Sequence, residues 1–349
     1  MGSSGSAASV RAELWRSWRG GPSVHCFLCA HHCRIAPGER GLCGVRENRE
    51  GVLYTSVYGR PISTAVDPIE KKPLFHFLPG TTSYSLATVG CNFACAFCQN
   101  ADISQMPRDH GLVAGRPLAP EQVVEEALSA GCASISYTYT EPTVFYEYAR
   151  DCARLATAAG LKNVFVTNGY MTAEALRDID GCLHAANVDL KSFSDEFYRT
   201  LVGARLKPVL DTIRRLWAMG VWVEVTTLLI PDRNDGEDEL RSLASFLASV
   251  SPDIPWHVSR FYPAYRLVGA PPTPVTLLER ALQIGREEGL RYVYAGNIPG
   301  HPAESTVCPA CGEIVIERQG FRMSRNGIVK GCCPRCGERI AAYLEEVGR

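Results

Sequence analysis

The chain has 349 residues and a formal net charge of −1. Hydrophobic residues make up 46% of it, which is enough for the core of one large α/β domain with small appendages. The near-zero charge gives no reason to expect nucleic acid as a partner. No apolar run approaches the length that spans a bilayer, so a membrane partner is not expected either.

The chain opens with a segment that we expect to be unstructured. MGSSGSAASV has neither the charged start nor the apolar run of a secretion signal, and MGSSGS is typical of an expression tag. Residues 1–22 are therefore predicted to be a disordered leader. Residues 23–80 form a Cys-rich metal-binding segment that ends in DPIEKKPLFHFLPG, whose prolines and glycine indicate irregular structure.

Residues 81–304 alternate between short β-branched or aromatic runs and longer amphipathic stretches. The predicted strands cover 84–89, 133–139, 163–167, 187–190, 222–230, 255–261 and 291–296, with helices at 120–131, 142–160, 207–220 and 237–250. Such alternation predicts βαβ units and a parallel sheet, and their number favours a partial or full (β/α) barrel of the TIM type. Barrels of this kind gather their chemistry at the carboxyl ends of the strands.

The stretch TVGCNFACAFCQN follows the first predicted barrel strand and carries Cys91, Cys95 and Cys98. Thiolates select soft metals and iron–sulfur clusters. Three cysteines bind three irons of a four-iron cluster and leave the fourth iron open to an outside ligand. The alternative is a redox or structural cluster that a distant fourth cysteine completes.

CNFACAFC resembles the CxxxCxxC signature of the radical S-adenosylmethionine (SAM) superfamily. The resemblance implies an enzyme with a [4Fe-4S] cluster on the three cysteines, SAM chelated to the fourth iron, and reductive cleavage of SAM to a 5′-deoxyadenosyl radical that abstracts hydrogen from a substrate. It also implies that Phe97 packs near the adenine, and that a reducing protein such as flavodoxin or ferredoxin supplies electrons.

Polar residues at the ends of the next two strands fit the same resemblance. Thr140 and Glu141 are similar to the superfamily's glycine-glycine-glutamate motif, which receives the SAM ammonium, although Tyr139 and Thr140 replace the glycines. Glu141 is alternatively a carboxylate favoured by a helix N-terminus. Asn168 occupies a position with a ribose or carboxylate contact in the family, or is a turn residue.

Asp189 and Lys191 lie on one face of their strand because side chains alternate along it. They resemble the D-x-K pair of glycyl-radical-enzyme activases, in which both residues contact SAM; the alternative is a structural ion pair. Asn234, in the loop after 222–230, resembles a residue of the activases' corresponding loop and is a further candidate for SAM binding.

The resemblance narrows to one subfamily over about residues 24–345. DPIEKKPLFHFLPG, YTYTEPTVF, VDLKSF, SRFYP and YVYAGNIPG are similar to the radical SAM member of the AmmeMemoRadiSam system. This implies AMMECR-type and Memo-type companion proteins, but no particular substrate. Three functions stay open: hydrogen abstraction from an unidentified substrate, activation of a glycyl-radical enzyme such as pyruvate formate-lyase, and a non-catalytic scaffold or electron carrier for the companions.

Two further cysteine sets flank the barrel. Without an export signal, clustered C-x2-C pairs predict metal ligands and a reducing, cytoplasmic location rather than disulfides. In residues 305–349, CPACG and CPRCG predict a zinc ribbon, with rubredoxin-type iron as the alternative and Cys332 a possible substitute for Cys333. The N-terminal set favours zinc over a second iron–sulfur cluster. The predicted ligands are Cys308, Cys311, Cys333 and Cys336 at the C-terminal site, and Cys26, Cys29, Cys33 and Cys43 at the N-terminal site.

Overall fold

The structure is a computed structural model that describes residues 9–344. Residues 1–8 of the predicted leader and residues 345–349 of the predicted C-terminal module lie outside the described residues. Within the described part, no helix combines the length and apolar character needed to cross a membrane.

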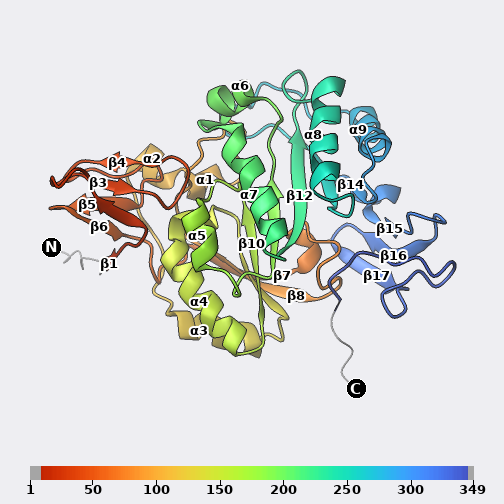
Figure 1. The fold of residues 1–349 in the computed structure, drawn as a ribbon, viewed down its shortest axis with the longest axis horizontal. Coiled ribbons are helices and arrows are strands. Elements are labelled where there is room, and N and C mark those ends of the chain that lie inside the picture. Colours follow the sequence, from red (N-terminus) through yellow and green to blue (C-terminus); the bar gives the residue numbers. More distant parts are fainter. Residues whose placement is uncertain (1–8, 345–349) are drawn as a thin grey trace.

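An eight-stranded sheet forms the centre of the molecule, in the order β14-β13-β12-β11-β10-β9-β8-β7 (Figure 1). Neighbours from β8 to β14 run parallel, and β7 pairs antiparallel with β8 at one edge. The predicted α/β class is confirmed. Among the described residues the sheet is open, with β7 and β14 as its two edge strands. The strands are β7 (Ser63–Pro68), β8 (Thr82–Ala87), β9 (Ser134–Tyr137), β10 (Lys162–Thr167), β11 (Ala185–Asp189), β12 (Trp222–Leu229), β13 (Trp256–Arg260) and β14 (Val293–Gly296).

Helices connect the parallel strands, because a parallel pair needs a crossover. In α7, Val209, Ile213 and Leu216 recur at helical spacing and are buried. The predicted helix from 142 begins as a 3-10 turn, η2 (Pro142–Phe145), before α4. The helices are α1 (Ala101–Ser104), α2 (Met106–His110), α3 (Pro120–Ser129), α4 (Tyr146–Ala158), α5 (Ala173–Asp178), α6 (Asp195–Phe197), η3 (Tyr198–Val202), α7 (Leu206–Ala218), α8 (Glu237–Val250) and α9 (Val275–Glu287).

The N-terminal segment contains two small antiparallel sheets, β1-β6-β5 and β2-β3-β4. The prediction of a disordered leader is wrong for residues 10–11 and 15–17, which form β1 and β2. These strands are too short to show a pattern, and pairing with β6 and β3 orders them. The strands are β1 (Val10–Arg11), β2 (Trp15–Ser17), β3 (Val24–Cys26), β4 (Arg34–Ile35), β5 (Arg46–Arg49) and β6 (Val52–Thr55).

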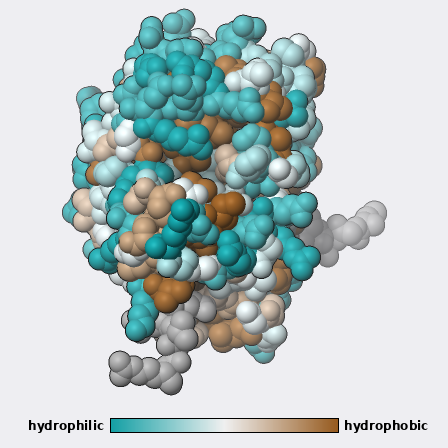
Figure 2. Space-filling model, turned by 90° about the vertical axis from the view of Figure 1, so that its right-hand side faces the viewer, coloured by the Kyte–Doolittle hydropathy of each residue, from teal (hydrophilic) through white to brown (hydrophobic). Residues whose placement is uncertain are grey.

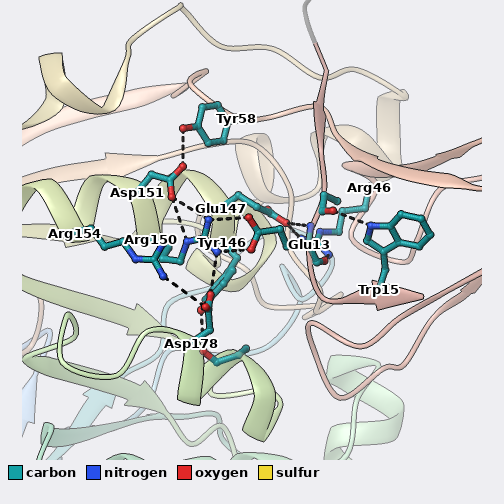
Figure 3. Close-up of polar contacts among 12 residues, drawn as sticks. Glu13, Trp15, Arg46, Tyr58, Tyr146, Glu147, Arg150, Asp151, Arg154 and Asp178 are labelled. Carbon is teal, nitrogen blue, oxygen red and sulfur yellow. Dashed lines mark hydrogen bonds and ion pairs between the residues drawn. The ribbon is translucent and has the colours of Figure 1, made fainter. Parts of the chain in front are cut away.

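A buried ion pair attaches this segment to α4 (Figure 3). Arg46, only 1% exposed, bonds through its guanidinium to the carboxylate of Glu147, which also accepts from the backbone N–H of Glu13 at 2.7 Å. Nearby, Arg150 is hydrogen-bonded to Asp178 at 3.0 Å. Removing either Arg46 or Glu147 would leave an uncompensated buried charge, so the fit between this segment and α4 depends on both.

Residues 69–78 pack against the sheet, where Pro73 accepts from Asn187 of β11 at 2.8 Å. This segment includes η1 (Ile69–Lys71) and follows β7, so the main sheet begins at residue 63 rather than at the predicted 81. The carboxylate of Glu224, near the start of β12, accepts from the backbone N–H groups of Phe75 at 2.9 Å and His76 at 2.8 Å. His76 in turn contacts the backbone oxygen of Ala341 at 2.6 Å, which ties the C-terminal module to this end.

The C-terminal module is a three-stranded sheet of β15 (Thr306–Val307), β16 (Ile314–Gln319) and β17 (Arg322–Asn326), preceded by η4 (Pro302–Glu304). β16 and β17 form a hairpin whose turn lies at 320–321. The module lies at the opposite end of the molecule from the N-terminal sheets (Figure 1). From the side of this module the surface is mostly hydrophilic, with hydrophobic residues gathered in a recessed band (Figure 2).

Candidate active site

A cavity of about 510 Å³ opens at the carboxyl ends of the parallel strands. It is lined by residues that end or follow successive strands, as expected for a barrel-type active site. Six of the seven predicted SAM-binding residues line it together with the three cysteines of the opening motif, and Asn234 does not. The six are Phe97, Thr140, Glu141, Asn168, Asp189 and Lys191.

The loop that carries the three cysteines is held by backbone and side-chain donors. The backbone N–H of Phe93 donates to Cys91 Sγ at 3.3 Å, and the hydroxyl of Ser104 lies 3.2 Å from Cys98 Sγ. Farther along the loop, Ala94 donates its N–H to the carbonyl of Val202 at 2.8 Å. These contacts fix the sulfurs at one wall of the cavity.

The three cysteines all line the cavity. Their thiols have the soft-ligand chemistry that suits an iron–sulfur cluster. A four-iron cluster bound by three cysteines keeps one iron open to an outside ligand on the cavity side.

The chain at Tyr139–Glu141 forms a tight turn after β9. Tyr139 has φ of 63°, in the left-handed region, at a position where the superfamily's motif has glycine. Glu141 is 2% exposed, and its carboxylate accepts from Thr167 Oγ1 at 2.7 Å and from the backbone N–H of Asn168 at 2.8 Å. Burial raises the pKa of Glu141, while these donors act against the rise. Glu141 thus joins the ends of β9 and β10.

Asn168 connects the end of β10 to the cysteine loop. Its Nδ2 donates to Asn92 Oδ1 at 2.7 Å and lies 3.8 Å from Cys91 Sγ. Its Oδ1 accepts from the backbone N–H of Tyr170 at 3.1 Å. The amide therefore has a fixed orientation, with its donor toward the cysteine loop.

Asp189 and Lys191 form an ion pair of 2.7 Å at the cavity wall, on one face as the alternation predicts. Burial alone would lower the pKa of Lys191, but the carboxylate of Asp189 together with the nearby Cys95 raises it, so the ammonium stays charged. Asn234 lies behind this pair, with Nδ2 donating to the carbonyl of Lys191 at 2.7 Å and Oδ1 accepting from the N–H of Ile230 at 2.7 Å. It holds the loop rather than facing the cavity.

Phe97 lines the cavity, and Asp67, which sequence patterns did not reveal, contacts the cavity residue Tyr139 without lining the cavity itself. Phe97 is 3% exposed overall and packs against Phe197 with ring centroids 5.8 Å apart. Asp67, on β7, accepts from Lys72 Nζ at 2.6 Å and from the hydroxyl of Tyr139. Burial lowers the pKa of Lys72 to about 8, which Asp67 partly offsets. The sequence around Asp67 is irregular in composition and did not indicate β7, so no periodic pattern could have pointed to this carboxylate.

Each of the two flanking cysteine sets gathers at one place. At the C-terminal module the four sulfurs lie within 4.8 Å of one another, with Cys308–Cys336 at 3.6 Å and Cys311–Cys333 at 3.7 Å, and Cys332 is outside the set. This spacing fits one tetrahedral ion about 2.3 Å from each sulfur. The four N-terminal cysteines line a separate small cavity.

Comparison with known proteins identifies the family. A family model described as the radical SAM superfamily matches residues 85–246, which include the three cysteines and the pair at the end of β11. The chain belongs to the radical SAM superfamily. Membership in this superfamily implies a [4Fe-4S] cluster and SAM, and the three thiols that line the cavity have the ligand chemistry for such a cluster.

Relatives of this radical SAM protein include a nearly full-length match. An uncharacterised protein of Methanocaldococcus jannaschii is 47% identical over 324 residues, which is 92% of this chain and 96% of that protein. The pyruvate formate-lyase 1-activating enzyme of Escherichia coli K12 is 23% identical over 165 residues, or 45% of this chain and 65% of the enzyme. Streptococcus suis SuiB bound to SAM shares the fold, with a TM-score of 0.50 and 12% identity over 64% of this chain and 52% of its own.

Proposed function

We propose that this radical SAM protein is an enzyme that cleaves SAM reductively and abstracts a hydrogen atom from a substrate in the cavity at the strand ends. The observation that supports it is the meeting, around one cavity, of a three-cysteine loop and the Asp189–Lys191 pair. A [4Fe-4S] cluster on these cysteines supplies, when bound, an open iron position and one electron for the cleavage to a 5′-deoxyadenosyl radical.

The residues around the cavity have the chemistry to hold SAM. Lys191 offers a cation and Asp189 a carboxylate, which suit the carboxylate and ammonium of the methionine part. Phe97 offers an aromatic surface for the adenine. Thr140, Glu141 and Asn168 orient the strand ends around these groups, and Asn234 fixes the loop that carries Lys191.

Two other functions stay in view. The similarity to pyruvate formate-lyase 1-activating enzyme favours installation of a glycyl radical on a partner enzyme as the second candidate. Membership of the AmmeMemoRadiSam subfamily, with AMMECR-type and Memo-type companions, is also part of the proposal, and a scaffold or electron carrier for them would need no SAM cleavage. At the C-terminal module we propose zinc, because four closely spaced thiolates suit it.

The test is anaerobic reconstitution, reduction with dithionite, and quantification of 5′-deoxyadenosine formed from SAM. We expect the native chain and Cys182→Ala, whose thiol is away from the cavity residues, to form it, and Cys95→Ala to form none. A native chain that holds its cluster and binds SAM, yet forms no 5′-deoxyadenosine with any AMMECR-type or Memo-type partner added, would support the scaffold instead. Failure to bind SAM would refute the proposal.

A further inference from the structure

The cavity at the strand ends has more lining residues than those that we assign to SAM and the cluster. Its volume of about 510 Å³ is in the usual range for sites that bind a small organic molecule. A second wall of the cavity comes from the segment after β7, from β12 and β13, and from the chain that follows β14. We define this second wall as Lys71, Pro73, Thr226, Leu228, Ser259 and Asn297.

A buried amide on β11 joins two parts of the second wall. Asn187 donates from Nδ2 to the carbonyl of Pro73 at 2.8 Å, and its Oδ1 accepts from Thr226 Oγ1 at 2.9 Å. Because Asn187 is fully buried, both hydrogen bonds are shielded from water. The segment after β7 is therefore fixed beside β12, and the second wall is continuous between them.

One charged group of the cavity is left without a role once SAM is placed. Among the described lining residues, the charged side chains are Lys71, Glu141, Asp189 and Lys191. The last two are assigned to the methionine part of SAM, and Glu141 is occupied by donors at the end of β10. Lys71 is therefore the charged group that remains for a substrate, and its charge is positive.

Lys71 shares a carboxylate with a second lysine. Asp67, which is 5% exposed, accepts from Lys71 Nζ at 2.8 Å and from Lys72 Nζ at 2.6 Å. Burial would raise the pKa of Asp67, but the hydrogen bonds from the two lysines outweigh it, so the pKa is lowered and the carboxylate is ionised. One negative charge faces two positive charges, and this group of three residues has a net positive charge.

Lys71 presents the excess positive charge to the cavity. The side chain of Lys72 is 1% exposed, whereas that of Lys71 is 43% exposed and lines the cavity. An ammonium has three N–H donors, and the one partner of Lys71 Nζ among the described residues is Asp67. Donors and an unbalanced charge are therefore available to an anion in the cavity.

We propose that the substrate of this radical SAM protein is a small molecule with an anionic group, a carboxylate or a phosphate, which binds to Lys71 in the second wall. The other residues of this wall are uncharged, so no carboxylate in it repels an anion. Lys71 binds and orients the anionic group and exchanges no proton with it. The assignment rests on the proposed function, and it favours a small molecule over the glycine of a partner enzyme, since a glycine within a peptide chain carries no charge.

Tyr139 limits the space beside Lys71. Its side chain lines the cavity, its hydroxyl donates to Asp67, and its backbone oxygen accepts from Asn100 Nδ2 at 2.8 Å. Lys72 Nζ lies 4.7 Å from the centre of the ring. These contacts hold a bulky residue in the left-handed region, which costs backbone strain. The ring thus lies next to the anion site, where it restricts the shape of the substrate.

Binding is tested with inorganic phosphate and acetate as probes, on the reconstituted full chain with SAM present and no reductant. Under these conditions SAM occupies Lys191 and is not cleaved. We expect the native chain to broaden the phosphorus resonance of phosphate or the methyl proton resonance of acetate, and the resonance that broadens identifies the preferred anion. Lys71→Met should reduce the broadening by roughly fivefold or more, and Lys71→Arg, which keeps the cation, should retain most of it.

Lys207→Met is the matched control. Lys207, like Lys71, pairs with an aspartate four residues away in the sequence, but on the surface. This variant should broaden the resonances as the native chain does. Equal broadening by the native chain and Lys71→Met, or broadening of neither resonance by the native chain, would overturn the proposal. A loss of SAM affinity by about tenfold in Lys71→Met would also overturn it, because Lys71 would then belong to the SAM site.

The class of substrate is tested by SAM cleavage with a small-molecule extract of the cells that carry this protein, divided on an anion exchanger. The retained fraction should raise the yield of 5′-deoxyadenosine severalfold, and phosphatase should abolish this effect for a phosphate ester but not for a carboxylate. Stimulation by the unretained fraction alone, or by neither fraction while SAM is cleaved, would overturn the proposal. A chain that binds the probes through Lys71 but cleaves no SAM would count against the proposed function alone.

Discussion

Asn168 and Asn92 face each other across the cavity wall, with Nδ2 of Asn168 donating to Oδ1 of Asn92 at 2.7 Å. Asn92 is 2% exposed and follows the first cluster cysteine, and its own Nδ2 has no partner among the described protein atoms. This amide pair thus connects the end of β10 to the cysteine loop, in addition to the contacts that the loop makes with Val202 and Ser104.

Asn168→Ala removes that hydrogen bond, so the buried side-chain oxygen of Asn92, Oδ1, loses its amide donor. We expect the free energy of unfolding to fall by about 1–3 kcal/mol and the reconstituted iron content to drop. Urea unfolding and iron analysis measure the two effects. Asn326→Ala, at an exposed position of β17, is the control and should change neither. Full iron content in Asn168→Ala would show that the amide pair does not support the cysteine loop.

Asp189 and Lys191 are predicted to bind SAM as a pair. Lys191→Met should weaken SAM affinity by roughly tenfold or more, which is about 1.4 kcal/mol, because a buried cation is lost from the cavity. Lys207→Met is the matched control, since Lys207 makes a 2.6 Å pair with Asp211 on the surface. Isothermal titration of the anaerobic protein with SAM measures both.

The double variant Asp189→Asn/Lys191→Met separates a binding pair from a structural one. If both groups contact SAM as one unit, the losses of affinity in the two single variants should not add. If SAM affinity stays native while the free energy of unfolding falls, the pair is structural.

The stability of the protein should depend on pH through His76. Burial lowers the pKa of His76 to about 4, from about 6.5 in the unfolded chain. The unfolded state therefore binds more protons between these values, and stability is lost as the pH falls from about 6.5 to about 4. The full effect of this one group is roughly 3 kcal/mol.

His76→Gln should flatten the fall in the free energy of unfolding over this pH window, measured by urea unfolding at several pH values. His110→Gln, at an exposed site in α2, should leave the slope as in the native chain. An equal slope in native and His76→Gln protein would show that another group accounts for the acid sensitivity.

The C-terminal site distinguishes two adjacent cysteines. Cys333 belongs to the set of four closely spaced sulfurs, and Cys332 does not. Cys333→Ser should lose about one zinc per chain and make residues 306–340 sensitive to protease, because this small module buries few apolar side chains and depends on its metal. Cys332→Ser should keep the zinc. Loss of metal in both variants would contradict the assigned ligand register.

The sequence predicts the parts of this protein that have local signatures. The spacing of Cys91, Cys95 and Cys98 and the alternation of Asp189 and Lys191 identify the site, because each follows from neighbours in the chain. The same reasoning misses β7, whose carboxylate Asp67 gains its lysine and tyrosine partners only in the folded sheet.

The sequence does not reveal the distances between side chains that lie far apart in the chain. The pairs Cys308/Cys311 and Cys333/Cys336 are separated by 21 residues in the sequence, yet their four sulfurs come within 4.8 Å of one another in the fold. The partnership of Arg46 with Glu147 joins residues that are 101 positions apart, so no pattern could have indicated it.

The cavity of Cys26, Cys29, Cys33 and Cys43 has walls made of Asn92 and Val144, and the segment that carries it is held by Glu147. During translation the four cysteines therefore leave the ribosome about a hundred residues before the chain that encloses them. The N-terminal centre can close only when α4 has been synthesised and docked. We therefore expect the N-terminal cysteines to bind metal only after α4 has been synthesised. A truncated chain that ends before α4 would contain the four cysteines but would not form the enclosed cavity.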